Sequence, residues 1–258
     1  MNVLCLGDVV GQAGVDDLLS RLPAVRRELR ADLVIVNGEN ASMGRGNGMT
    51  AEDVKDLFMA GADVITGGNH TFRQRNVYEL LDDSVSILRP ANYPPANPGR
   101  GSSVVRISGR DILVVNLAGR VGMEPAACPF ETFDRIVAEE KRRYDFIAVD
   151  FHAEATSEKV ALGHYVRERA AIFFGTHTHV QTADERILEG GCGYITDLGM
   201  CGPSCSALGL KTELIVWKFR TGMPCRFELA DTPCRMEGAL FTLDDRTYRC
   251  TAVRRISV

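Results

Sequence analysis

The first two-thirds of the chain alternate short apolar, β-branched runs with amphipathic stretches. This alternation is typical of parallel strands covered by helices. Thr50 followed by Asp53 predicts a capping box at the start of the second helix. The expected strands are Val3–Leu6, Leu33–Asn37, Asp63–Thr66, Ile112–Leu117, Phe146–Asp150 and Ala171–Phe174, and the expected helices are Asp16–Leu29, Ala51–Ala60, Gln74–Leu81, Glu131–Arg143 and Glu158–Arg169.

The remaining segments have a different pattern. A β-hairpin is predicted from Val104–Ile107 and Ile112–Val115 across a turn of polar residues and glycine. The proline-rich segment Pro90–Pro98 is expected to be a loop inside the fold, because strand patterns continue beyond it. No domain boundary is indicated, so residues 1–258 are expected to form one domain. After Gly175 we expect no further helix but a second, mainly antiparallel sheet built from short runs such as Arg186–Leu188, Gly193–Thr196 and Glu213–Phe219.

Composition narrows the class of protein. With 45% hydrophobic and 25% charged residues, the chain has the profile of a globular protein with a full core. Its net charge of −4 predicts neither a stable nucleic-acid complex nor attachment to an anionic membrane. The eight cysteines, with no secretory signal ahead of them, predict reduced thiols and a cytoplasmic location. Cys201 and Cys205 could bind a metal or form a disulfide, or they could be incidental thiols near the rim of a site.

Polar clusters directly follow five of the apolar runs, and they hold four of the five histidines. In open α/β sheets, ligands bind at the carboxyl ends of strands. Carboxylate and amide oxygens together with imidazole nitrogens are the ligands of a pair of catalytic divalent metals, so the clusters predict a metal-dependent hydrolase. The fifth histidine, His164, lies in a helical pattern and is expected to have no chemical role. The residues at or just after the ends of predicted strands are Asp8, Glu39, Asn69, Asn116, His152, His177 and Asp197.

Two other enzyme classes fit less well. Gly7, Gly11 and Gly14 after the first strand, with Glu39 near the end of the second, favour a dinucleotide-binding fold. The glycine spacing is not the standard one, and Asp8 would place a carboxylate where a pyrophosphate must approach the backbone. That interpretation also leaves the histidines without a role. A serine hydrolase is disfavoured, because the sequence contains no Gly-x-Ser-x-Gly elbow.

In their order, the clusters resemble the calcineurin-like metallophosphoesterase superfamily, whose pattern runs Gly-Asp, a later acid, Gly-Asn-His, a lone His and His-x-His. The sequence departs from that pattern twice, with Asp8-Val9-Val10 in place of Asp-x-His and Glu39-Asn40 in place of a bridging aspartate. In both departures it resembles a narrower group, the YmdB-like proteins, which are bacterial 2′,3′-cyclic-nucleotide phosphodiesterases. Cys201 departs from that group where a hydroxyl or small residue is expected. The segments that resemble the group's signatures are Gly7–Gly11, Val36–Ala41, Thr66–His70, Gly175–Asp184 and Thr196–Met200.

The resemblance implies an α/β fold, specifically a four-layer α/β/β/α sandwich with two mixed sheets flanked by helices. It also implies two metal sites that share Glu39. The first cation is expected on Asp8, Glu39, Asn40 and His179, and the second on Glu39, Asn69, His152 and His177. A bridging carboxylate would keep two cations about 3.5–4 Å apart. Oxygen and imidazole ligands without a thiolate favour iron or manganese, with zinc as the alternative, over calcium.

The expected reaction is hydrolysis of a small phosphodiester, a 2′,3′-cyclic nucleotide, by in-line attack of a metal-bridging hydroxide. His70 follows a ligand directly and could face the substrate, so we expect it to be the general acid, with a structural histidine as the alternative. Arg45, in a glycine-rich loop, could reach the substrate or be solvated. Basic residues near the clusters are otherwise few (Arg73 and Arg120), which favours a monoanionic diester over a monoester. The alternative function is a regulatory or scaffold protein with a vestigial or weakly active site, and a homo-oligomer is compatible with the sequence.

Overall fold

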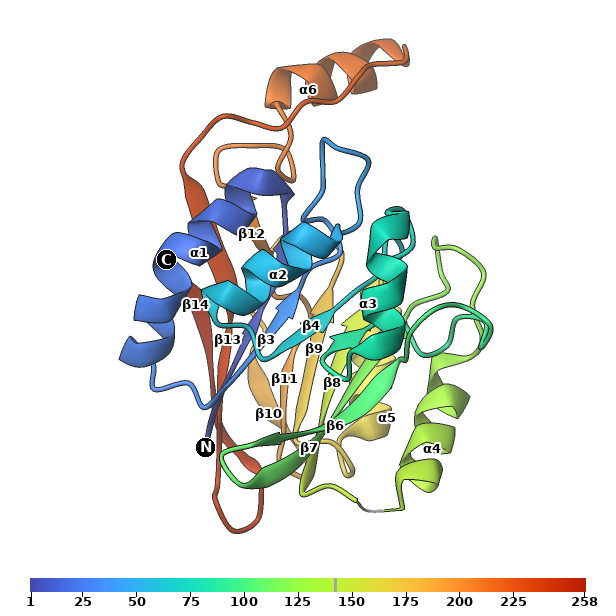
Figure 1. Ribbon diagram of the computed structural model, residues 1–258, viewed down its shortest axis with the longest axis vertical. Coiled ribbons are helices and arrows are strands. Elements are labelled where there is room, and N and C mark those ends of the chain that lie inside the picture. The colour runs from blue at the N-terminus through green and yellow to red at the C-terminus, as the bar shows by residue number, and fades with distance from the viewer. Residues whose placement is uncertain (142) are drawn as a thin grey trace.

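Two β-sheets pack face to face in the computed structural model, which describes residues 1–141 and 143–258 (Figure 1). The first sheet has eight strands in the order β2-β12-β13-β1-β3-β4-β5, with β14 paired to β13. Its strands are β1 (Asn2–Leu6), β2 (Asp8–Val9), β3 (Leu33–Asn37), β4 (Val64–Thr66), β5 (Ile87–Leu88), β12 (Met200–Pro203), β13 (Cys234–Leu243) and β14 (Cys250–Ser257).

The second sheet has six strands in the order β10-β11-β9-β8-β7-β6. Its central strands β7, β8, β9 and β11 are parallel, and an antiparallel strand closes each edge. The predicted hairpin is confirmed as β6 and β7. The strands are β6 (Ser102–Ile107), β7 (Arg110–Ala118), β8 (Phe146–His152), β9 (Ile172–Thr176), β10 (Arg186–Leu188) and β11 (Cys192–Ile195).

Helices cover the outer face of each sheet, and the alternation of side chains along each strand explains why. In β1, Val3 and Cys5 face the second sheet, whereas Leu4 and Leu6 face the helices, because successive residues of a strand point to opposite sides. Helices α1 and α2 pack on the first sheet, and α4 and α5 pack on the second. The predicted four-layer sandwich is therefore confirmed. The helices are α1 (Gly11–Glu28), α2 (Ala51–Ala60), η1 (Arg75–Val77), α3 (Tyr78–Asp83), α4 (Pro129–Glu140), α5 (Thr156–Val166) and α6 (Thr212–Thr221).

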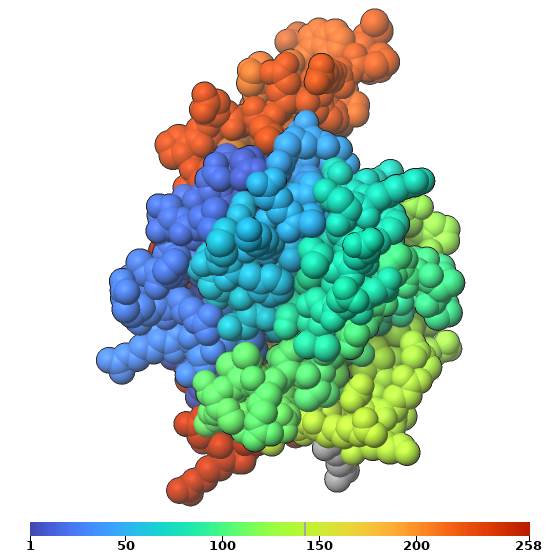
Figure 2. All heavy atoms as spheres, in the orientation of Figure 1, coloured from blue at the N-terminus to red at the C-terminus, as the bar shows by residue number. Residues whose placement is uncertain are grey.

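The structure corrects the expectation for the last third of the chain. Those strands do not form a separate antiparallel sheet, since β10 and β11 extend the second sheet while β12, β13 and β14 extend the first. Helices also do not stop after Gly175, because Glu213–Phe219, expected as a strand, lies in α6. That helix has no buried residue and ends at Gly222 in the left-handed conformation. Figures 1 and 2 show its segment standing off the rest of the molecule, away from any sheet edge that could pair with a strand.

Two local predictions are confirmed, and one predicted helix end differs. The capping box of Thr50 and Asp53 is present at the start of α2, and residues 90–98 form a loop between β5 and β6. The expected end of the fourth helix at Arg143 differs, because α4 ends at Glu140 and residue 142 lies outside the described residues. Across the described ranges, no helix is both long and apolar enough to cross a membrane.

Candidate metal centre

The expected ligands converge at the carboxyl ends of strands from both sheets. His177 directly follows β9, and His152 is the last residue of β8. Glu39 and Asn69 come two and three residues after the ends of β3 and β4. Asp8 comes two residues after β1, since Gly7 separates them. Parallel strands that start on the same side bring their carboxyl ends to the same edge. The site therefore lies where the corresponding edges of the two sheets meet.

His152 is the centre of one group of ligand atoms. Its Nε2 lies 2.9 Å from Asn69 Oδ1, 3.1 Å from His177 Nδ1 and 3.5 Å from Glu39 Oε1. The ligand atoms that Glu39, His152 and His177 offer all lie within 4.8 Å of one another. Glu39 and His152 are fully buried. These residues belong to the set that was expected to hold the second cation.

The hydrogen bonds behind His152 determine which of its nitrogens carries the hydrogen. Thr176 Oγ1 donates to Asp150 Oδ1 at 2.8 Å, so at 3.0 Å it can only accept from His152 Nδ1. Burial lowers the pKa of His152 well below its ordinary value, which leaves the ring neutral. Its Nε2 then has a lone pair that faces an amide oxygen and a carboxylate. A cation among them would satisfy all three, and such support behind a histidine is usual at metal sites.

Asp8 and His179 form the second group. Asp8 Oδ1 accepts from the backbone N–H of His177 at 3.1 Å, and Oδ2 lies 3.3 Å from His179 Nε2. His179 Nδ1 faces the carbonyl of Leu208 at 3.3 Å, which leaves Nε2 for the site. Burial opposes charge on His179, but the carboxylates of Asp8 and Glu39 outweigh it and raise the pKa of His179 to about 9. The proton on His179 thus balances negative charge that a bound cation would otherwise neutralise. The carboxylate and imidazole of this group therefore fit a metal ion.

Asn40 lies between the two groups. Its Nδ2 donates to Glu39 Oε1 at 2.8 Å and lies 3.0 Å from His179 Nε2, while its Oδ1 faces His70 Nδ1 at 2.9 Å. An amide binds a metal through its oxygen, so Asn40 would serve the first cation after a half-turn of the amide group.

His70 sits at the edge of the centre. Its backbone N–H donates to Glu39 Oε2 at 2.8 Å, and its Nδ1 lies 3.1 Å from Glu39 Oε1. Because Nδ1 faces two acceptors, Glu39 and Asn40, it carries a hydrogen. The ring is 21% exposed, and among the described residues Nε2 has no partner. His70 can therefore present Nε2 to a bound molecule.

The backbone of the His-x-His segment is not extended. His177 and His179 have φ angles of 100° and 61°, in the region that side-chain-bearing residues rarely adopt. As a result, the His177 ring turns towards His152 and the His179 ring towards Asp8. Residues held in such conformations cluster at functional sites. Because of these backbone angles, His177 joins the group around His152 and His179 joins the group around Asp8.

Asp197 supports this segment without joining the ligand groups. Asp197 Oδ2 accepts from Lys159 Nζ at 2.6 Å, and both side chains are only 1% exposed. The same oxygen accepts from the backbone N–H and hydroxyl of Thr178, at 3.2 and 2.8 Å. A carboxylate that follows a predicted strand was visible in the sequence, but its buried lysine partner on α5 was not.

The other expected residues lie around the centre. Asn116 is buried in β7 and accepts from the backbone N–H of Gly67 at 3.3 Å. Arg45 pairs with Asp53 at 2.7 Å and is 46% exposed. His164 is exposed on α5, Cys201 is buried in β12, and both Cys201 and Cys205 are free thiols.

Sequence reasoning missed one contact of the site. His177 Nε2 lies 3.1 Å from Glu154 Oε2, a half-exposed carboxylate. Glu154 comes two residues after His152, and only that spacing could have drawn attention to it.

Comparisons with known proteins agree with this architecture. The profile of the family described as YmdB-like protein matches residues 4–256. The chain is 42% identical to a 2′,3′-cyclic-nucleotide 2′-phosphodiesterase of Bacillus subtilis, over 100% of this chain and 97% of that protein.

Solved structures show the same likeness. A hypothetical protein from Thermus thermophilus superposes with a TM-score of 0.93 at 39% identity, covering 100% of this chain and 99% of that one. A novel phosphatase of Mycoplasma pneumoniae gives 0.93 at 34% identity, covering 100% and 93%. A 5′-nucleotidase precursor from Thermus thermophilus, at 12% identity and a TM-score of 0.63 over 100% of this chain and 54% of that one, shares the fold.

Proposed function

The chain belongs to the YmdB-like protein family, and from that premise we propose that it is a metal-dependent phosphodiesterase that hydrolyses 2′,3′-cyclic nucleotides. The observation that carries the proposal is the close approach of three ligand atoms, His152 Nε2, Asn69 Oδ1 and Glu39 Oε1, around one buried histidine. The activity named for the 42%-identical relative supports the substrate class.

We assign the expected ligands to two cations. Asp8, Glu39, Asn40 and His179 would hold the first, and Glu39, Asn69, His152 and His177 would hold the second. The contact of Glu39 Oε1 with His152, and of the neighbouring Asn40 with His179, supports Glu39 as the shared ligand. When bound, iron or manganese would supply positive charge to the phosphodiester and lower the pKa of a water molecule.

The residues of the chain account for the proton that the leaving oxygen needs. Glu39 holds His70 through Nδ1, so its orientation is set from the side of the metal centre. Nε2 can then hold a proton and give it to the ribose oxygen as the phosphorus–oxygen bond breaks. A water molecule supplies the oxygen of the new bond to phosphorus, and the product is a nucleoside monophosphate.

A cavity of about 330 Å³ beside Asn69 suits the nucleoside part of the substrate. Phe72 and Tyr93 line it with ring centroids 6.2 Å apart, and aromatic faces bind nucleobases by stacking. Burial and the charges of Glu39 and Glu124 raise the pKa of Tyr93 to about 12, so its hydroxyl stays a donor at neutral pH. Arg73 is the only cation among the residues that line this cavity, which matches the single charge of a cyclic diester.

Substrate preference tests the proposal directly. Metal-loaded protein is expected to cleave 2′,3′-cyclic AMP and GMP with much higher kcat/KM than p-nitrophenyl phosphate, and to contain close to two transition metals per chain. Glu39→Gln should abolish turnover and lower the metal content while circular dichroism stays unchanged. Glu52→Gln, an exposed acid on α2, is the control. A clear preference for the monoester would reject the diesterase assignment, and bound metals without turnover would favour the regulatory or scaffold protein.

A further inference from the structure

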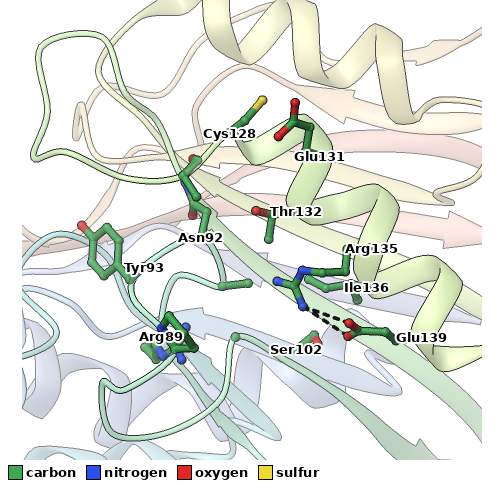
Figure 3. Close-up of a pocket in the computed structure, with 14 residues that line it drawn as sticks. Arg89, Asn92, Tyr93, Ser102, Cys128, Glu131, Thr132, Arg135, Ile136 and Glu139 are labelled. Carbon is green, nitrogen blue, oxygen red and sulfur yellow. Dashed lines mark hydrogen bonds and ion pairs between the residues drawn. The ribbon is translucent and has the colours of Figure 1, made fainter.

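A larger cavity lies away from the candidate metal centre, between the segment that follows β5 and helix α4 (Figure 3). Its volume is about 670 Å³, and none of the proposed metal ligands lines it. Tyr93 is the one lining residue that it shares with the proposed nucleoside cavity. The two cavities therefore lie on either side of one residue.

Arg89 contributes a buried positive charge to this cavity. Arg89 is only 6% exposed, and its Nη1 donates to the carbonyl of Pro90 at 2.8 Å. Its buried Nε has no hydrogen-bond partner, and no acid of the described chain forms an ion pair with Arg89. Burial lowers the pKa of Arg89, and the charge of Arg135 lowers it further. A buried charge without a counter-ion destabilises the folded protein, so an anion from solution would relieve a cost already present.

Arg135 brings a second guanidinium from α4 (Figure 3). Its Nη1 lies 3.2 Å from Glu139 Oε2, with the two side chains 56% and 60% exposed. An ion pair that is this exposed contributes little, so Arg135 can exchange Glu139 for a ligand. Ser102 and Thr132 also line the cavity, and neither hydroxyl is hydrogen-bonded to another described residue. Two cations and two hydroxyls thus line one cavity.

We propose that this cavity binds a small organic anion through a phosphate or carboxylate group, held by the guanidinium groups of Arg89 and Arg135. The planar fork of a guanidinium matches both oxyanions with paired hydrogen bonds. The volume exceeds that of the oxyanion alone, and Ala91, Pro95 and Ile136 offer an apolar wall for an organic body. Glu131 and Glu139 at the same cavity disfavour a highly charged polyanion, so the ligand carries one anionic group.

The thiol of Cys128 can report on occupancy of this cavity independently of the metal centre. This half-buried thiol lines the cavity, whereas Cys205 is exposed elsewhere. Metal-loaded protein is treated with iodoacetamide at increasing inorganic phosphate, and alkylation of each thiol is followed by peptide mass spectrometry. Phosphate is expected to slow Cys128 several-fold with saturation and to leave Cys205 unchanged. Acetate in a second series tells the two groups apart, because the better-fitting oxyanion protects at the lower concentration.

Charge variants then assign the protection to the two arginines. Arg135→Gln, at an exposed position that the fold tolerates, is expected to raise the protecting concentration about tenfold, the effect of one charge-assisted contact. Arg89→Gln should do at least as much. Arg106→Gln removes the same charge from an exposed position on β6 and should have no effect. Unchanged alkylation of Cys128 in phosphate and acetate, or equal effects of Arg106→Gln and Arg135→Gln, would overturn the proposal.

Discussion

At the scale of single residues, His70 could act either as a proton donor to the leaving group or as a group that positions the substrate. Its Nδ1 is occupied by Glu39, so the part that remains for chemistry is Nε2. If Nε2 gives a proton to the leaving oxygen, its contribution must depend on how much that oxygen needs the proton. If the ring only positions the substrate, the contribution is the same for every leaving group.

We therefore expect His70→Ala to lower kcat for 2′,3′-cyclic AMP by about 10²–10⁴-fold. The loss should be much smaller for bis(p-nitrophenyl) phosphate, whose leaving group is already acidic. Steady-state kinetics at constant metal content measures both, with His164→Ala, an exposed histidine of α5, as the control. An equal loss on the two substrates would assign His70 to positioning.

At the scale of elements, Asp53 ties the start of α2 to the loop that precedes it. Its carboxylate accepts from Ser42 Oγ, from the backbone N–H of Thr50 at 2.8 Å and from Arg45 Nη2 at 2.7 Å. Burial would raise the pKa of Asp53, but the hydrogen bonds from Ser42, Thr50 and Arg45 together lower it below the usual range. The same loop leads back to Glu39 and Asn40, so the cap anchors the segment that follows these two candidate ligands.

Asp53→Asn is expected to lower the free energy of unfolding at pH 7 by about 1–2 kcal/mol, through the lost cap and charged hydrogen bonds. The folded pKa lies below the unfolded one, so this stabilisation is present above about pH 4 and is lost as pH falls through the folded pKa. Urea unfolding at pH 7, 5 and 3 should show the difference between the proteins shrinking at the lowest pH. Glu52→Gln controls for acidic charge in the same helical turn. A difference that is constant with pH would contradict the role of the carboxylate.

At the scale of the whole molecule, stability depends on the core between the two sheets. Phe174 of β9 and Phe241 of β13 are both fully buried there, with ring centroids 6.5 Å apart. One strand belongs to each sheet, so this contact joins the halves that carry His152 and Asp8. By contrast, Phe219 on α6 is 82% exposed.

The same substitution at both positions tests this division. Phe174→Ala is expected to lower the free energy of unfolding by about 3–5 kcal/mol, through lost burial and the cavity that remains. Phe219→Ala should change it by no more than about 0.5 kcal/mol. Denaturant midpoints with unchanged slope measure both, and a comparable cost at Phe219 would show that α6 packs on the molecule in solution.

Local patterns in the sequence were sufficient for much of this protein. Strands such as Leu33–Asn37 and helices such as Ala51–Ala60 were predicted with their observed bounds, because periodicity and caps are local properties. The ligand candidates also followed from sequence, since Glu39, His152 and His177 each end or follow a strand and parallel strands share an edge.

Only the tertiary structure decided how these parts combine. The strands after Gly175 divide between two sheets, because hydrogen-bond partners far along the chain select the pairing. Glu213–Phe219 has β-forming side chains, yet it is helical where no sheet edge reaches it. The positive φ angles of His177 and His179, the pair of Lys159 with Asp197 and the unpaired Arg89 are likewise long-range results. Each depends on which residues surround a side chain in space, and that is settled by packing rather than by neighbours in sequence.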